Sequence, residues 1–199
     1  MKEFINIVKY KHIHALIQQF RFQEASNLLE ILIQFKPDEQ CWFGLRLICS
    51  SLGPNKDEFI VWDRIIQQKF PGSSQAWMAM ALYPGVKIQL AKTALQTALK
   101  LDSENPYIYY FMAKTYLYLE NYSQALKYSD HCLELDPNFH LAYFIRIECN
   151  HRLGNFPHQI RDTFTVNCFM QGMNMKHVFK KLLDELARMS DSSKSNPPD

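Results

Sequence analysis

Hydrophobic positions recur along most of the chain at the spacing of an α-helix, and runs that alternate between apolar and polar residues are missing. The segment 105–138 shows this pattern most clearly. Four of its residues stand at i, i+3, i+4 and i+7 and form one stripe of a helix: Tyr109, Met112, Ala113 and Tyr116. A turn at residues 120–121 precedes a second apolar stripe, which Pro137 ends. The segment therefore predicts a helical hairpin.

Turn signals recur along the chain at a nearly constant interval. Four of them are separated by 34, 32 and 34 residues: Pro37, Pro71, Ser103 and Pro137. Another 34 residues lead to Gln171 and the sequence QGMN. A period of this length is typical of stacked helical hairpins, each of which buries its apolar faces against its neighbours. We therefore predict an all-α chain of about five such hairpins.

Small residues stand among large aromatic ones in the clearest hairpin. Where two antiparallel helices and the next hairpin cross closely, only a side chain as small as alanine fits. The tyrosines fill the wider gaps around these crossings. We therefore expect Ala113 and Ala125 to be buried at the close crossings of this hairpin.

This order of residues resembles the tetratricopeptide repeat. The positions that match its motif are Tyr109, Met112, Ala113, Tyr116, Ala125, Cys132 and Pro137. Ser129 departs from the motif, because a large ring is usual there. Segments 15–38 and 77–103 match in part, whereas 41–71 and 142–171 match mainly in length. The resemblance covers about residues 9–171 and implies a right-handed superhelix with a concave groove lined by the first helix of each hairpin.

We expect three parts along the chain. Residues 1–171 form the repeat array, residues 172–189 form an amphipathic helix, and the Ser/Pro-rich residues 190–199 are disordered. The apolar face of this helix consists of Met175, Val178, Phe179, Leu182, Leu183 and Leu186. It is expected to cap the array, since a last hairpin without a cap exposes an apolar face. The alternative is that this helix fills the groove.

Composition and charge limit which kinds of partner the protein can have and in which cellular compartment it is expected. Apolar residues make up 47% of the chain, and the net charge of +2 comes without a basic block, so a nucleic acid partner is not expected. Lys2, Glu3, Lys9 and Lys11 interrupt the first apolar stretch, which excludes a signal peptide or membrane span there. Five cysteines without a CxxC pair are expected to be buried free thiols. We predict a cytoplasmic protein without membrane insertion.

Motifs for catalysis, metal binding and cofactor binding are missing from the sequence. There is no GxSxG, HExxH, Walker-type or GxGxxG pattern. The pairs His131 with Cys132 and Cys149 with His151 lie one and two positions apart, so on a helix their side chains diverge. We therefore predict no metal, no cofactor and no enzymatic activity. The alternative is an enzyme whose activity depends on His131 or His151.

The predicted groove has a largely apolar and aromatic wall. It consists of the residues on first helices that fall outside the packing stripe: Met78, Leu82, Tyr107, Tyr110, Phe111, Lys114, Tyr118, Leu141, Phe144, Ile145 and Glu148. An exposed apolar patch of this extent is typical of a binding site for another protein. Such a wall suits an apolar peptide or an amphipathic helix.

Some proteins with this repeat grip the C-terminal carboxylate of heat-shock chaperones with a lysine and asparagine cluster. The resemblance places Tyr110 and Lys114 at the corresponding points of the best repeat, without the asparagine. The other repeats offer Tyr10, His14, Leu45, Phe144 and Glu148. This clamp is therefore not expected. We predict a protein-binding adaptor or chaperone, and the alternatives are a structural subunit of a larger assembly, with homo-oligomers among them, and a bacterial secretion chaperone.

Overall fold

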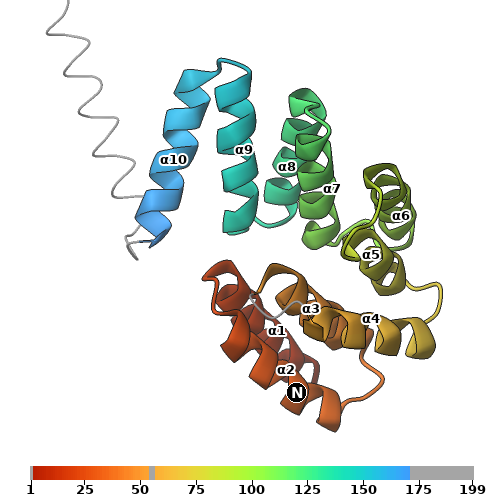
Figure 1. Cartoon of the computed structure of the whole chain (residues 1–199). Helices are drawn as coiled ribbons and strands as arrows, with labels where there is room; N and C mark the ends of the chain where they lie inside the picture. The colour runs from red at the N-terminus through yellow and green to blue at the C-terminus, as the bar shows by residue number, and fades with distance from the viewer. Residues whose placement is uncertain (1, 54–56, 171–199) are drawn as a thin grey trace, which may run out of the picture.

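The computed structural model describes residues 2–53 and 57–170, with side chains from residue 9 onward, and every regular element in these ranges is an α-helix. The helices form five consecutive hairpins (Figure 1): α1 (Lys2–Gln18) and α2 (Phe22–Phe35), α3 (Gln40–Leu52) and α4 (Asp57–Lys69), α5 (Ser74–Leu82) and α6 (Ile88–Leu101), α7 (Pro106–Tyr118) and α8 (Tyr122–Leu135), α9 (His140–Arg152) and α10 (Phe156–Met170). The predicted array of five hairpins is confirmed. The predicted helix at 172–189 and tail at 190–199 lie outside the described residues.

The helix boundaries follow the predicted period. Helices α2, α4, α6 and α8 each end two residues before one of the four predicted turn signals. At three of these points the signal is a proline, which disfavours helical geometry in the residue before it and so ends the helix. The following helices α3, α5, α7 and α9 consequently begin 34, 32 and 34 residues apart.

The turns inside the hairpins share a left-handed backbone residue. Positive φ angles occur at Phe20 (60°), Gly85 (80°), Glu120 (56°) and Gly154 (73°), between the two helices of four hairpins. Glycine adopts this conformation without strain, whereas a residue with a Cβ atom does so at some cost. Two of the four turns therefore tolerate strain in order to reverse the chain within a few residues.

The small residues of the best repeat are buried, as predicted. Ala113 of α7, Ala125 of α8 and Ala142 of α9 are all fully buried. They belong to one continuous core that runs from α1 to α9, and a smaller second core joins α3, α4 and α5. The predicted burial of Ala113 and Ala125 is confirmed.

Two arginines hold neighbouring outer helices together in the same way. Arg146 on α9 donates to Asp162 on α10, with Nε 2.8 Å from Oδ2, and to Asp130 on α8, with Nη1 3.0 Å from Oδ1. Arg46 on α3 likewise contacts Glu30 on α2, with Nη2 3.0 Å from Oε1, and Glu58 on α4. Each arginine thus ties its own hairpin to the preceding one.

The array curves so strongly that its first helix faces its last two hairpins. Figure 1 shows α7 to α10 standing side by side above the group formed by α1 to α4. The rings of Phe20, at the end of α1, and Phe144 of α9 lie 6.1 Å apart. Within the described ranges, no helix is both long enough and apolar enough to cross a membrane.

Candidate protein-binding site

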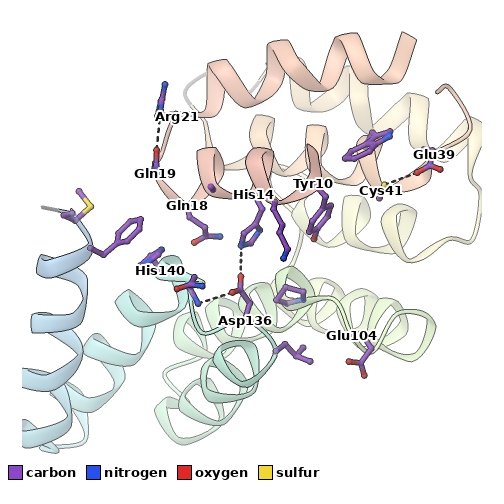
Figure 2. A pocket seen from close by; sticks show the side chains of 18 residues that line it. Tyr10, His14, Gln18, Gln19, Arg21, Glu39, Cys41, Glu104, Asp136 and His140 are labelled. Atoms are coloured by element: carbon purple, nitrogen blue, oxygen red, sulfur yellow. Dashed lines mark hydrogen bonds and ion pairs between the residues drawn. The ribbon is translucent and has the colours of Figure 1, made fainter. Parts of the chain in front are cut away.

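A cavity of about 1350 Å³ lies between α1 and the helix ends opposite it. Tyr10, His14 and Gln18 follow one another at four-residue spacing on α1, and Figure 2 shows all three directed toward the opposite wall. Most of the rest of the lining comes from the start of α3, from the end of α8, from the loops before α7 and α9, and from the end of α10: Glu39, Cys41, Trp42, Glu104, Pro106, Leu135, Asp136, Asn138, His140, Phe169 and Met170. Lys11, Ala15, Gln19 and Arg21 complete the lining. The cavity is thus built from parts of the chain far apart in sequence.

His14 connects the two walls of the cavity. Its Nε2 lies 2.7 Å from Oδ2 of Asp136, and its Nδ1 lies 2.9 Å from the hydroxyl of Tyr107. Because a carboxylate only accepts, Nε2 carries a proton, and in the neutral ring Nδ1 accepts from Tyr107. Burial alone raises the pKa of Asp136, but its hydrogen bonds from His14 and the Asn138 N–H outweigh burial and lower it. The cavity is therefore closed at this point by a charge-assisted contact.

Gln18 completes the start of α9. The residue before this helix, Phe139, has no side-chain acceptor for the first amides of the helix, as serine or asparagine would. The Oε1 of Gln18 instead accepts from the backbone N–H of Leu141 at 3.2 Å. This contact joins residues 123 positions apart in sequence and fixes α1 against α9.

Three polar atoms at the cavity lining are buried without a hydrogen-bond partner in the described part of the chain. They are Nε2 of Gln18, Nε1 of Trp42 and Nδ1 of His140. All three side chains are more than nine-tenths buried. A buried polar group without a partner costs roughly 1–3 kcal/mol. A ligand that brings acceptors to this lining would recover part of that free energy.

His140 should make the stability of the chain depend on acid pH. Burial, opposed by Asp136 and reinforced by His14, lowers the pKa of His140 from its ordinary value to about 4. Between pH 6.5 and 4 the unfolded chain therefore binds more protons than the folded one, and stability falls as pH falls through this window. The largest loss is about 3 kcal/mol.

The measurement is urea denaturation of the wild-type chain and the His140→Gln variant at several pH values between 7 and 4.5. The wild type should lose more stability than the variant over this range, since glutamine does not titrate. Equal pH dependence in both proteins would show that His140 keeps an ordinary pKa.

Comparison with known proteins finds one matching repeat and a shared fold. A family model described as tetratricopeptide repeat matches residues 106–139, which contain α7, α8 and the turn before α9. The crystal structure of the APC/C hetero-tetramer Cut9-Hcn1 superimposes with a TM-score of 0.66 at 16% identity, over 78% of this chain. Residues 106–139 thus match the tetratricopeptide repeat, and the chain shares the helical-repeat fold of the solved structure. Its predicted fold class, an all-α solenoid of this type, is confirmed.

The similarity to solved structures is one of fold. The chain spans 30% of the length of the Cut9-Hcn1 chain that it matches. A structure of MamA from AMB-1 matches 89% of this chain and 98% of its own, with a TM-score of 0.50 and 13% identity. No curated protein sequence matches the chain. The repeat is generally a non-catalytic interaction fold, which supports a protein-interaction or scaffolding role.

The predicted wall of the groove is largely core in the structure. Six of its eleven residues are buried: Met78, Tyr107, Tyr110, Phe111, Leu141 and Ile145. These six are therefore buried rather than exposed on an open wall, and their role in binding stays a prediction. The physical reason is the strong curvature, which brings α1 and Phe139 over the start of α7. The ring of Phe139 lies 4.9 Å from that of Tyr107 and 5.5 Å from that of Tyr110.

The other five wall residues remain accessible. Tyr118 is 70% exposed and Phe144 is 42% exposed, while Leu82, Lys114 and Glu148 are half-buried. None of the eleven lines the large cavity, although Met78 and Tyr107 line a smaller hollow beside it. A role of these residues in binding stays a prediction.

Sequence reasoning missed most of the residues that line the cavity. Tyr10 and His14 were named only as positions where the carboxylate clamp is lacking, and Gln18, Asp136 and His140 were not named. The sequence of α1 does contain a signal for these residues. Tyr10, His14 and Gln18 stand four residues apart and form a polar stripe within an otherwise apolar sequence. Their partners after α8 and on α9, such as Asp136 and Leu141, leave no such signal in the sequence, because only the curvature of the array brings them near α1.

The cysteines are all free thiols, as predicted, and four of the five are buried while Cys41 is half-buried. Burial raises the pKa of Cys41 and of Cys149 to about 11, so these thiols stay protonated near neutral pH. Within the ranges 2–53 and 57–170, no group of three His, Cys, Asp or Glu side chains is arranged to hold a metal ion.

Proposed function

We propose that this chain is a non-catalytic protein-binding module whose cavity between α1 and the α7–α10 side holds a segment of another protein. The observation that carries this proposal is the cavity of about 1350 Å³ with three buried, unpartnered polar groups in its lining. Pockets that bind ligands combine apolar walls with a few such directed polar groups. This cavity replaces the more open groove that the apolar wall predicted.

The lining suits a peptide better than a small polar metabolite. Pro106, Leu135 and Phe169 offer apolar surface for side chains. Nδ1 of His140 and the amide of Gln18 can meet the main-chain groups that every peptide carries. The volume lies above the range of about 300–1,000 Å³ typical of small-molecule sites. An extended or helical segment of several residues matches both the size and the chemistry.

Filling the cavity should abolish peptide binding without unfolding the chain. Ala15 is exposed on α1 and lines the cavity, so the Ala15→Trp variant places a large ring where the segment would lie. The probe is a display library of random peptides selected on the wild-type chain. Peptides selected in this way should lose at least about tenfold in affinity for Ala15→Trp, measured by fluorescence polarisation.

The matched control is Gln96→Trp, which adds the same ring at an exposed position of α6 outside the cavity lining. Its peptide affinity should equal that of the wild type. Circular dichroism of both variants checks that the helices persist. Equal binding by Ala15→Trp and the wild type would place the peptide site elsewhere and remove the cavity from the proposal.

A structural subunit of a larger assembly is the second candidate, and one observation favours it. Leu28, Ile31 and Phe35 stand at i, i+3 and i+7 on α2 and are all exposed, Phe35 by 80%. They form an apolar stripe on the outside of the first hairpin, a surface that suits a permanent interface. Under this alternative, assembly is unaffected by Ala15→Trp because α2 presents the interface.

A further inference from the structure

The inference drawn here rests on the proposed function and concerns the chemistry of the bound segment. A smaller hollow of about 190 Å³ adjoins the large cavity at the end nearest α3 and α7. Four residues line both spaces: Tyr10, Cys41, Glu104 and Pro106. The hollow is large enough for a few water molecules or one long side chain. A segment in the large cavity can therefore place one of its side chains in the smaller one.

Carboxylates gather at this end of the cavity. Asp102 and Glu104 line the hollow, and Glu39 lines the cavity beside it. Asp102 accepts from Nδ2 of Asn105 at 2.9 Å, and the side chain of Glu104 is exposed at the rim. These acidic groups come from the α2–α3 and α6–α7 loops, which the curvature of the array brings together.

The basic groups nearby do not neutralise these carboxylates. Lys36 lies 3.9 Å from Glu39 in an exposed pair, which contributes little in water. Arg21, toward the other end of the lining, is held by Glu24 at 2.5 Å. Lys11 is exposed on α1 and lines the large cavity, not the small hollow. Among the described residues, the lining of the hollow thus contains two carboxylates and no basic side chain, so the hollow carries a net negative charge although the whole chain is at +2.

The pKa values of neighbouring groups agree with a negative field here. Burial is the main cause that raises the pKa of Tyr10 to about 12, and Cys41, Asp136 and Asp102 raise it further. Burial likewise raises the pKa of Cys41, and the charge of Glu39 adds to it. Both groups resist ionisation mainly because they are buried, and the neighbouring negative charges add a smaller effect in the same direction. A positive charge in the same place would be attracted.

The walls of the hollow suit the apolar stem of a basic side chain. Leu45, Ile48 and Met78 offer aliphatic surface, and Tyr10 and Tyr107 contribute rings. Lysine and arginine bury their methylene stems against such surfaces while their charged heads stay near water and carboxylates. An aromatic ring beside the head adds a cation–π attraction.

We propose that the bound segment carries a lysine or arginine whose side chain enters the small hollow, with its stem against Leu45 and Met78 and its head between Asp102 and Glu104. The main chain of the segment then runs through the large cavity toward Gln18 and His140. The partner is thus a protein with an apolar segment that contains a basic residue. An acidic segment is disfavoured, because its carboxylates would face those of the hollow.

The test is the residue preference of peptides selected from a random display library on the full chain. Selected peptides should be enriched in lysine or arginine over aspartate and glutamate at one position. The Glu104→Lys variant should bind such a basic peptide about tenfold more weakly, and should bind better a peptide with glutamate at that position. The matched control is Glu134→Lys, the same charge change at an exposed position of α8 outside both linings.

Each result bears on the proposal. Enrichment of basic residues, weakened by Glu104→Lys and unchanged by Glu134→Lys, supports it. Peptides selected without a basic preference overturn the inference and leave the proposed function standing. Basic peptides that both variants weaken equally show a general charge effect and overturn the placement in the hollow. If the library yields no binders, both the inference and the proposed function fail.

Discussion

Replacing Ala113 with glutamate should abolish cooperative folding of the chain. Ala113 is fully buried in the middle of α7, within the core that joins α1 to α9. A glutamate there either buries a charge without a partner or forces the helices apart, and either costs several kcal/mol. The stability of a domain is only about 5–15 kcal/mol, so the loss is a large fraction of the total. Thermal melting followed by circular dichroism should show a broad, low transition in place of a cooperative one.

The control for this variant is Ser123→Glu, which places the same side chain at an exposed position in the first turn of α8. A negative charge near a helix N-terminus is mildly stabilising, so this variant should melt like the wild type or slightly above it. A cooperative melt of Ala113→Glu at the wild-type temperature would refute the close crossing at this position.

The period and the close crossings could be predicted because both are local. Pro37, Pro71 and Pro137 end helices through their own backbone geometry, whatever surrounds them. The stripe of Tyr109, Met112, Ala113 and Tyr116 defines a packing face by spacing alone. Each repeat also meets mainly its neighbours, so the pattern of one hairpin specifies its contacts with the next.

The cavity could not be predicted because it depends on the sum of small rotations between hairpins. A slightly wider superhelix would leave Tyr107 and Tyr110 on an open wall, as the sequence pattern suggested. The observed curvature instead brings His14 within 2.7 Å of Asp136, a residue 122 positions away. The sequence pattern therefore predicted correctly which side chains are buried between adjacent helices. It predicted wrongly that the side chains covered by the distant α1 are exposed.

A second large effect is expected from Arg146→Met. Arg146 is the partner of Asp162, a carboxylate that is fully buried on α10. Methionine keeps most of the packing volume but leaves this carboxylate with only Arg161, whose Nε is 3.6 Å from Oδ1 and whose side chain is half exposed. Breaking a buried ion pair from one side costs about 3–5 kcal/mol. For a chain of this size, the melting temperature should fall by roughly 6–20 °C in a thermal scan.

The double variant Arg146→Met/Asp162→Leu separates the cost of an unpaired buried carboxylate from the cost of lost packing. Without either buried charge, stability should return to within about 1 kcal/mol of the wild type, since an apolar pair can replace a buried ion pair. Asp130, the other partner of Arg146, is 47% exposed and keeps contact with water. If the double variant is as unstable as Arg146→Met, the loss comes from packing around the arginine stem. Because α10 ends in Phe169 and Met170 at the cavity, restored stability should also bring restored peptide binding.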